Sequence, residues 1–403
     1  MKSTKNLYEA FINGKLFAYF LLFSIPVSIP LTRLSVKFLF VWFILSLLFL
    51  RAKPKIVKKD LIALLFPLYQ LSLSAFKGTL TAFFRAPNGL TPVLSYWVRF
   101  SEADVVGGLN LFLLGAAFLS IGSCVQSLFS VPDYRLFFSG NFHLHLSVHR
   151  PNHTFVGHPL TAGALVSAAF ILSLLLYLRH RRALYLLSAL LNLSAVILLF
   201  NRTYWVAVLS FSFVIFFFIL RNLKLFAILT LAFAVSIFSV PQLKERFVSI
   251  FDVKHNGSNR YRIAMWVGAL EFFSQAPLSE KLFGVGRDGY RKEVKPFVER
   301  AQKRFSLHPH FFSHLHSDYI TVLIWYGILG LFIFLFTFFY FMWVNLKAFK
   351  GTGDYLYLFF FSFYLLILVG GVFEYNLEDE AVKYMIYAFM GLNVKLLAEK
   401  GAP

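Results

Sequence analysis

The chain has 403 residues, of which 58% are apolar and only 14% are charged, and its net charge is +20. Soluble domains are nearer half apolar and a quarter charged. The apolar residues here also form uninterrupted runs, which excludes a soluble globular fold. A run of about 20 apolar residues spans a bilayer and must be helical, because its backbone groups find no water there. The basic residues lie mostly between the runs, where they orient helices and meet anionic headgroups. We therefore expect an all-α polytopic membrane protein, with membrane lipids and no nucleic acid among its partners.

Eleven apolar runs predict membrane spans. In chain order they cover residues 11–30, 34–50, 61–76, 105–130, 156–178, 183–200, 203–220, 223–240, 318–346, 354–373 and 380–397. The first run lacks a small-residue cleavage site, so we interpret it as a retained span and not as a signal peptide. Cys124 is the single cysteine and cannot form a disulfide within the chain.

Basic residues in the short loops predict the orientation of these spans. Residues 51–59 and 179–182 are the strongest cytoplasmic signals, yet only three clear spans separate them. Two loops on the same side require an even number of crossings, so we expect a further crossing near Leu90–Phe100. The alternative is a re-entrant or interfacial segment there. With about 12 transmembrane helices, both termini are cytoplasmic and residues 1–403 form a single transmembrane domain.

This topology places three polar segments on the outer side: residues 131–155, the junction at Asn201-Arg202, and the large loop 241–317 before the last three helices. Apolar spacing in Asn259–Phe273 predicts an amphipathic helix lying on the membrane. The glycine-rich stretch Phe283–Tyr290 lacks the preceding strand and following helix of a phosphate-binding loop, so it predicts a turn.

Ten of the eleven histidines lie on the outer side: nine fall in these segments, and His158 lies at the outer end of the span 156–178. The first group consists of His143, His145, His149, His153 and His158; the second consists of His255, His308, His310, His314 and His316. A metal site needs histidine pairs at ligand spacing, with a carboxylate or cysteine nearby. The i, i+2 pairs here place partners on opposite sides of a helix. We therefore interpret most of them as loop or headgroup-facing residues and predict no metal, with the role of the His143–His158 cluster left open.

Three outer residues could carry chemistry. His316 precedes an apolar helix that Ser317 or Asp318 could cap, and a neutral imidazole at that position can accept a proton. Arg202 stands between two apolar runs, where the alternative role is an arginine that reaches the headgroups. Arg262 begins the amphipathic helix. Guanidinium groups hold phosphate oxygens bidentately and can stabilise a departing diphosphate without a metal. These residues suggest a transferase with a phosphate-activated lipid donor.

At these residues the chain resembles the superfamily of O-antigen ligases and O-antigen polymerases, which are bacterial envelope glycan transferases. His316-Ser317, nine residues and Gly327-Ile-Leu-Gly330 resemble the histidine motif of the ligases. Leu331 departs from the Thr or Val that this motif prefers, and leaves the polymerases open. Asn201-Arg202-Thr-Tyr-Trp205 is similar to the Ser-Arg-x-x-Trp motif. Arg262-Ile-Ala-Met-Trp266, with Pro277 and Gly284-Val-Gly286, is similar to the block in the large periplasmic loop.

The resemblance implies a metal-independent, inverting glycosyltransferase without a cofactor, at the periplasmic face of the bacterial inner membrane. The donor would be a glycan on undecaprenyl diphosphate, and the acceptor a sugar hydroxyl of lipid A-core. Arg202 and Arg262 would bind the diphosphate, and His316 would activate the acceptor. His314, Arg260 and Glu374 are possible supporting residues.

Other functions remain open at this point. A polymerase would join the same donor to another lipid-linked repeat, and an oligosaccharide transferase would act on protein. A membrane transporter or flippase would bury ionisable residues at mid-membrane and break helices in two corresponding halves. The predicted spans are nearly free of charge and the interesting residues gather at one face, which favours an enzyme.

Overall fold

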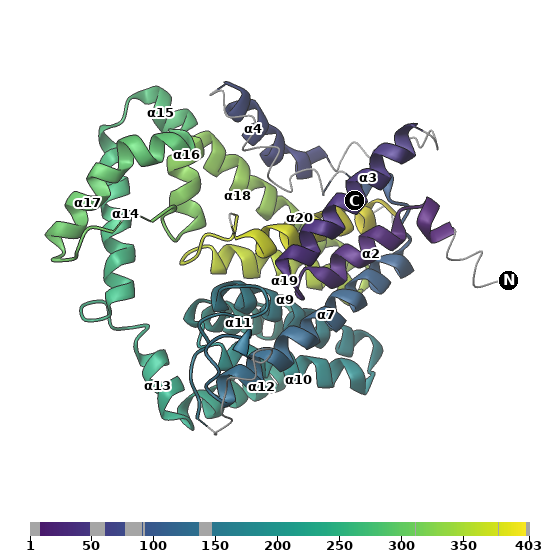
Figure 1. Cartoon of the computed structure of the whole chain (residues 1–403). Helices are drawn as coiled ribbons and strands as arrows, with labels where there is room; N and C mark the ends of the chain where they lie inside the picture. Colours follow the sequence, from purple (N-terminus) through teal and green to yellow (C-terminus); the bar gives the residue numbers. More distant parts are fainter. Residues whose placement is uncertain are drawn as a thin grey trace.

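The computed structural model describes residues 9–48, 61–76, 91, 93–136, 147–310, 312–377 and 379–399. Over these ranges the chain is helical, with isolated bridges but no strand (Figure 1). The helices of the first half are α2 Lys15–Ser24, α3 Ile29–Leu48, α4 Ile62–Phe76, η3 Val93–Trp97, α7 Glu102–Leu128, α9 Pro159–His180, α10 Ala183–Leu198, α11 Arg202–Ser212, η4 Phe213–Ile219 and α12 Leu223–Phe238. The second half contains α13 Pro241–Val248, α14 Gly257–Gln275, α15 Leu278–Phe283, α16 Gly286–Gly289, η5 Tyr290–Val294, α17 Lys295–Arg304, α18 Asp318–Thr352, α19 Tyr355–Gly370 and α20 Glu380–Glu399.

Six helices of the described ranges are long and apolar enough to cross a membrane, or seven if the sharply bent pair α12 and α13 is one span. They are α3, α7, α9, α11 with η4, α18 and α20. Four shorter apolar helices, α2, α4, α10 and α19, account for the other predicted runs. The all-α prediction is confirmed, and the chain contains several helices able to span a membrane. The total of about 12 and the orientation stay predictions.

Two predicted boundaries differ from the structure. The first run ends early, because α2 stops at Ser24 and α3 already begins at Ile29. Pro26 lies in the intervening turn, and Pro30 occupies the first turn of α3, where proline is tolerated. Near the predicted extra crossing, the described part forms only the five-residue η3. A helix of that length is shorter than a bilayer is thick, so it does not by itself provide the crossing.

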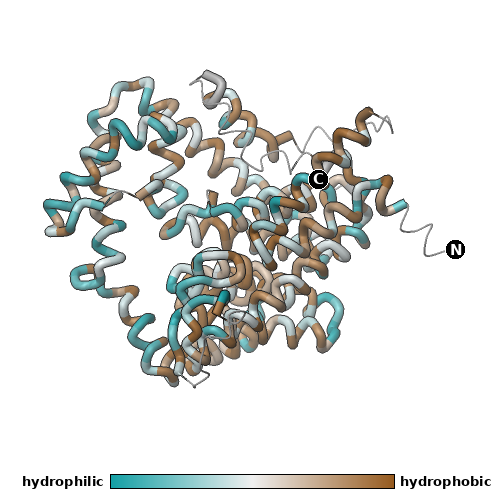
Figure 2. Tube along the Cα trace, in the orientation of Figure 1, coloured by the Kyte–Doolittle hydropathy of each residue, from teal (hydrophilic) through white to brown (hydrophobic). Residues whose placement is uncertain are grey.

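The most buried helices are α9, α19 and α20, which lie at the centre of the apolar bundle. Helices α13–α17 form a more polar group at one side, at the left of Figure 1, and Figure 2 shows the change in hydropathy. This group belongs to the predicted large loop 241–317 and packs against α18 of the bundle through α14, α15 and α16. Helix α14 confirms the predicted helix at Asn259–Phe273; its position on a membrane stays a prediction.

Helix α18 is kinked at Gly327, near its N-terminal end. Gly327 has φ +72 and ψ −174, outside the helical range, so the helix bends at this residue. The hydroxyl of Tyr69 on α4 donates to the Tyr326 carbonyl at 2.8 Å. A short first segment, Asp318–Tyr326, is thereby aimed differently from the rest of α18 and carries the residues beside the site.

Candidate active site

One buried carboxylate, that of Glu374, lies within 4 Å of two residues predicted to form the site, Arg262 and His316. Glu374, in the loop between α19 and α20, is 6% exposed. Its Oε1 accepts from Arg262 Nη2 at 2.7 Å and from Thr203 Oγ1 at 3.2 Å, and its Oε2 lies 3.9 Å from His316 Nδ1. The structure thus brings together Arg262 from α14, His316 from the loop before α18, and Glu374. Burial alone would raise the pKa of the Glu374 carboxyl, but His316, Arg262 and Thr203 outweigh this effect and lower it.

Arg202 is the first residue of α11 and is only 8% exposed. Its Nη1 donates to the carbonyl and the hydroxyl of Ser249, at 2.7 and 3.1 Å, just past the end of α13. The side chain is therefore largely enclosed by protein. It also lies within electrostatic range of Arg262 and Glu374.

Two arginines that sequence reasoning missed lie in the same group. Arg150 and Arg246 both interact electrostatically with Arg262 and Glu374. Arg246 Nε donates to the Phe200 carbonyl at 3.2 Å, whereas the buried Nε of Arg150 has no hydrogen-bond partner within the described ranges. Burial lowers the pKa of Arg150, partly offset by Glu374. No spacing or motif distinguished either residue; only the fold brings them together.

We call Arg150, Arg202, Arg246 and Arg262 the arginine cluster. Glu374 is the carboxylate that acts on all four. Four guanidinium groups against one carboxylate leave a strong excess of positive charge in a partly buried place, which is suited to an anion with several charges. Arg260 is not part of it, because its Nη2 donates to the Phe305 carbonyl.

His316 stands in an unusual backbone conformation. Its φ is +47, a left-handed value that is uncommon for residues other than glycine and costs energy. Its N–H donates to His314 Nδ1 at 3.2 Å, and the two ring centroids are 4.4 Å apart. The buried Nδ1 of His316 has no hydrogen-bond partner among the described residues. His314 therefore supports the backbone at the residue predicted to act as a base.

His314 is expected to make the protein less stable in mild acid. Burial, followed by the charge of His316, lowers the pKa of His314 to about 4. The unfolded chain, with a histidine pKa near 6.5, then binds more protons between about pH 6.5 and pH 4, so stability falls as the pH falls through that window. His314→Asn keeps a side-chain acceptor for the His316 N–H but removes the titration. Its thermal midpoint should fall less than that of the wild type between pH 7.5 and pH 5; an equal fall would contradict this expectation.

The predicted caps of α18 have a different role. Ser317 is the N-cap by position, but its hydroxyl donates to the Gly371 carbonyl, so it does not cap the helix. The Asp318 carboxylate accepts from the Leu377 N–H at 3.2 Å and from Asn376 Nδ2 at 3.0 Å. The Asp318 N–H donates to the Gly371 and Glu374 carbonyls. These bonds fasten the start of α18 to the loop 371–377 and set Glu374 beside His316.

The predicted glycine turn supports the same region from the other side. Gly284 and Gly286 have φ values of +71 and +75, so the chain turns there as predicted. The prediction is wrong for the rest of the stretch, because α16 begins at Gly286 and η5 follows at Tyr290. The Val285 N–H donates to the Ile324 carbonyl at 2.9 Å. A Cβ at Gly284 would lie 2.4 Å from the backbone of Trp325, and one at Gly327 would lie 2.2 Å from the Leu282 carbonyl oxygen. The glycines therefore allow two backbones to touch, and this contact holds the kinked start of α18.

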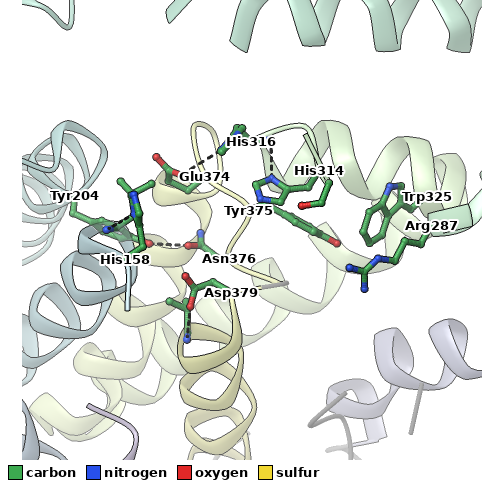
Figure 3. Close-up of a pocket in the computed structure, with 13 residues that line it drawn as sticks. His158, Tyr204, Arg287, His314, His316, Trp325, Glu374, Tyr375, Asn376 and Asp379 are labelled. Atoms are coloured by element: carbon green, nitrogen blue, oxygen red, sulfur yellow. Dashed lines mark hydrogen bonds and ion pairs between the residues drawn. The ribbon is translucent and has the colours of Figure 1, made fainter. Parts of the chain in front are cut away.

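Two cavities adjoin Glu374. The first, of about 390 Å³, contains His316 and Glu374 together with His158, Leu160, Tyr204, Arg287, Ser313, His314, Trp325, Tyr375, Asn376, Asp379 and Val382 (Figure 3). The second, of about 150 Å³, is mostly apolar and is lined by Arg202, Thr203, Val206, Ile250, Val253, Asn259, Arg262, Ile263, Trp266 and Phe373. Glu374 lines the first cavity, and its partners Thr203 and Arg262 line the second. The Arg262–Glu374 ion pair thus stands between them.

The other histidines of the outer segments do not form a cluster where they are described. His149 Nδ1 bonds Ser130 Oγ at 2.7 Å, and His158 Nδ1 accepts from the Leu160 N–H at the start of α9. His143 and His145 lie outside the described residues. Within the described ranges, no group of three or more His, Cys, Asp or Glu side chains is arranged to hold a metal ion.

Comparison with known proteins gives one finding. Residues 187–335 match the family model of the O-antigen ligase. No curated protein matches the chain significantly. The matched segment runs from α10 into α18 and includes Arg202, Arg262, His316 and Gly327, whereas Arg150 and Glu374 lie outside it. This match confirms the resemblance seen in the sequence: over residues 187–335 the chain is similar to the O-antigen ligase family.

Proposed function

We propose that the protein is an O-antigen ligase of lipopolysaccharide biosynthesis, which transfers a glycan from undecaprenyl diphosphate to a sugar hydroxyl of lipid A-core. The observation that carries this proposal is the arginine cluster around one carboxylate, beside a histidine with an unpartnered ring nitrogen. The family match supports the reaction class. In this reading the site faces the periplasm from the bacterial inner membrane, with both termini cytoplasmic.

The two cavities suit the two halves of such a donor. The 150 Å³ cavity has arginine side chains at one part and aliphatic and aromatic side chains elsewhere. A prenyl chain would lie against the apolar residues, with its diphosphate at Arg202 and Arg262. A lipid-linked diphosphate carries about two negative charges and gains about one more as it leaves. The excess positive charge of the arginine cluster matches that increase, so the cluster stabilises the leaving group more than the bound donor.

His316 would act on the acceptor in the larger cavity. Its neutral imidazole takes the proton of the acceptor hydroxyl as the hydroxyl oxygen bonds to the anomeric carbon. The bond from that carbon to the phosphate oxygen breaks, and its electron pair leaves with the diphosphate. Attack from the side opposite the leaving group inverts the anomeric centre. Separate sites for acceptor and donor are supported by the two cavities. His316 lines the larger cavity with Glu374, whereas Arg202 and Arg262 line the smaller one.

Arg262 is expected to contribute a forked contact that lysine does not reproduce. Arg262→Lys should weaken binding of undecaprenyl diphosphate about 10-fold or more, the scale of one charge-assisted hydrogen bond. Arg260→Lys, two residues away and bonded only to a carbonyl, is the matched control and should change binding little. Equal binding by the two variants, measured by calorimetry on protein in detergent, would place the diphosphate elsewhere.

The acceptor is tested by incubating the purified protein with lipid-linked glycan, with and without lipid A-core. Transfer to the core supports the ligase. Growth of the glycan on undecaprenyl diphosphate, without transfer to the core, would instead make the protein a polymerase of the same superfamily.

A further inference from the structure

Glu374 divides its two oxygens between an arginine and a histidine. Oε1 is held by Arg262 at 2.7 Å and by Thr203 at 3.2 Å. Oε2 lies 3.9 Å from His316 Nδ1, which is longer than a hydrogen bond. The carboxylate is therefore engaged by Arg262 in this state, while the nearby imidazole nitrogen is buried and has no partner within the described ranges.

A phosphate at Arg262 would compete with this carboxylate. Arg262 lines the 150 Å³ cavity and His316 lines the larger one, so an anion in the smaller cavity reaches the guanidinium that now holds Glu374. Glu374 is 6% exposed and cannot remain ionised at low cost without a cationic partner. Once the positive charge of Arg262 is shared with phosphate, the nearest alternative is a protonated His316, about 1 Å beyond hydrogen-bond distance.

We infer that Glu374 is a positioning residue that couples donor binding to activation of His316. The resting pair Arg262–Glu374 is exchanged for two new pairs, Arg262 with phosphate and Glu374 with the His316 imidazolium. When donor binds alone, the imidazole takes a proton from solvent, and this proton returns to solvent before transfer. During transfer the neutral imidazole takes the proton of the acceptor hydroxyl, and Glu374 stabilises the imidazolium that forms. The inference rests on the proposed function, because it requires a diphosphate at the arginine cluster. Its consequence is that His316 is a strong base only when the donor is in place.

Other ionisable groups also act on Glu374 and bear on any pH profile. They are Arg150 from the loop before α9, Arg202 and Tyr204 of α11, Arg246 of α13, His158, His314, Asp318 and Asp379. Among the described residues, Arg262 and His316 are the cationic side chains within 4 Å of its carboxylate. The exchange therefore concerns these two residues.

The first test compares binding and catalysis in Glu374→Gln, with farnesyl diphosphate as a soluble prenyl diphosphate probe. Removal of a competing carboxylate should tighten binding of the probe about 3- to 10-fold, while transfer slows about 10- to 100-fold because the imidazolium loses its partner. Glu271→Gln is the matched control: it removes the same charge from α14, where Glu271 forms an ion pair with Arg304 of α17. Weaker binding by Glu374→Gln would show that Glu374 only holds Arg262 in place, and would overturn the inference.

The second test uses the wild type and does not depend on the folding of a variant at Glu374. Calorimetry in two buffers of different ionisation enthalpy measures the protons taken up when farnesyl diphosphate binds at neutral pH. The wild type should take up more protons than His316→Asn, because binding protonates His316. Equal proton uptake by the two proteins would overturn this inference but leave the proposed function standing. If the wild type binds no farnesyl diphosphate, the proposed donor class fails, and the inference fails with it.

Discussion

His316→Asn is expected to slow glycan transfer by about 10²- to 10⁴-fold, the usual contribution of a general base. Asparagine suits the φ of +47 at this position because it tolerates left-handed backbone well, so the fold should be preserved. Undecaprenyl diphosphate does not contact His316 in the proposed arrangement, and its affinity should change far less than the rate. The measurement is single-turnover transfer from a labelled lipid-linked donor.

The matched control for this change is His308→Asn. His308 lies in the same loop, and the contact it makes to Tyr261 uses its backbone carbonyl, which the substitution keeps. It should retain the wild-type rate. A His316→Asn protein that transfers as fast as His308→Asn would exclude His316 as the base.

Gly327→Ala is expected to be the most damaging small substitution for the fold. The φ of +72 is strained for any residue with a Cβ, and the added carbon would lie 2.2 Å from the Leu282 carbonyl oxygen. Both partners are backbone, so neither can move away cheaply. We expect a loss of about 4 kcal/mol or more, seen as a much lower thermal midpoint or as failure to yield monodisperse protein in detergent.

Gly351→Ala provides the comparison on the same helix. It lies near the end of α18, where an added Cβ meets nothing within 4 Å. Alanine there should stabilise the helix by up to about 1 kcal/mol. If both variants melt at the same temperature, the backbone contact between residues 282–285 and the kink of α18 does not hold this region together.

The apolar runs were sufficient to predict the helices, because an uninterrupted run has one stable form in a bilayer. Each predicted run carries a helix, and the errors are at ends, as where α3 begins at Ile29 instead of residue 34. The number of membrane crossings was harder to predict from the sequence. Two cytoplasmic basic loops must be separated by an even number of crossings, which predicts a crossing near residue 95. The described part there is only a five-residue helix, η3, packed on α20.

The site was predicted where a motif carried it. Motifs pointed to Arg262 and His316, and the structure brings both to Glu374, although the three positions are 54 and 58 residues apart along the chain. No motif carried Glu374, and the roles of all three stay predictions. Arg150 and Arg246 could not be found in the sequence, because a single arginine in a basic chain has no distinguishing spacing. Ser317 and Asp318 were assigned to capping because their residue types favour it. The structure instead uses them to hold the loop 371–377, a tertiary contact that local pattern does not encode.

The role of the arginine cluster in catalysis is tested most directly by transfer in the presence of EDTA. Purified protein receives a lipid-linked glycan donor and lipid A-core in detergent, and the product is followed over a single turnover. If four arginines stabilise the departing diphosphate, transfer proceeds at the same rate with and without EDTA, and falls when Arg202 or Arg262 is replaced by alanine. Transfer that stops in EDTA and returns on addition of a divalent cation would contradict the account.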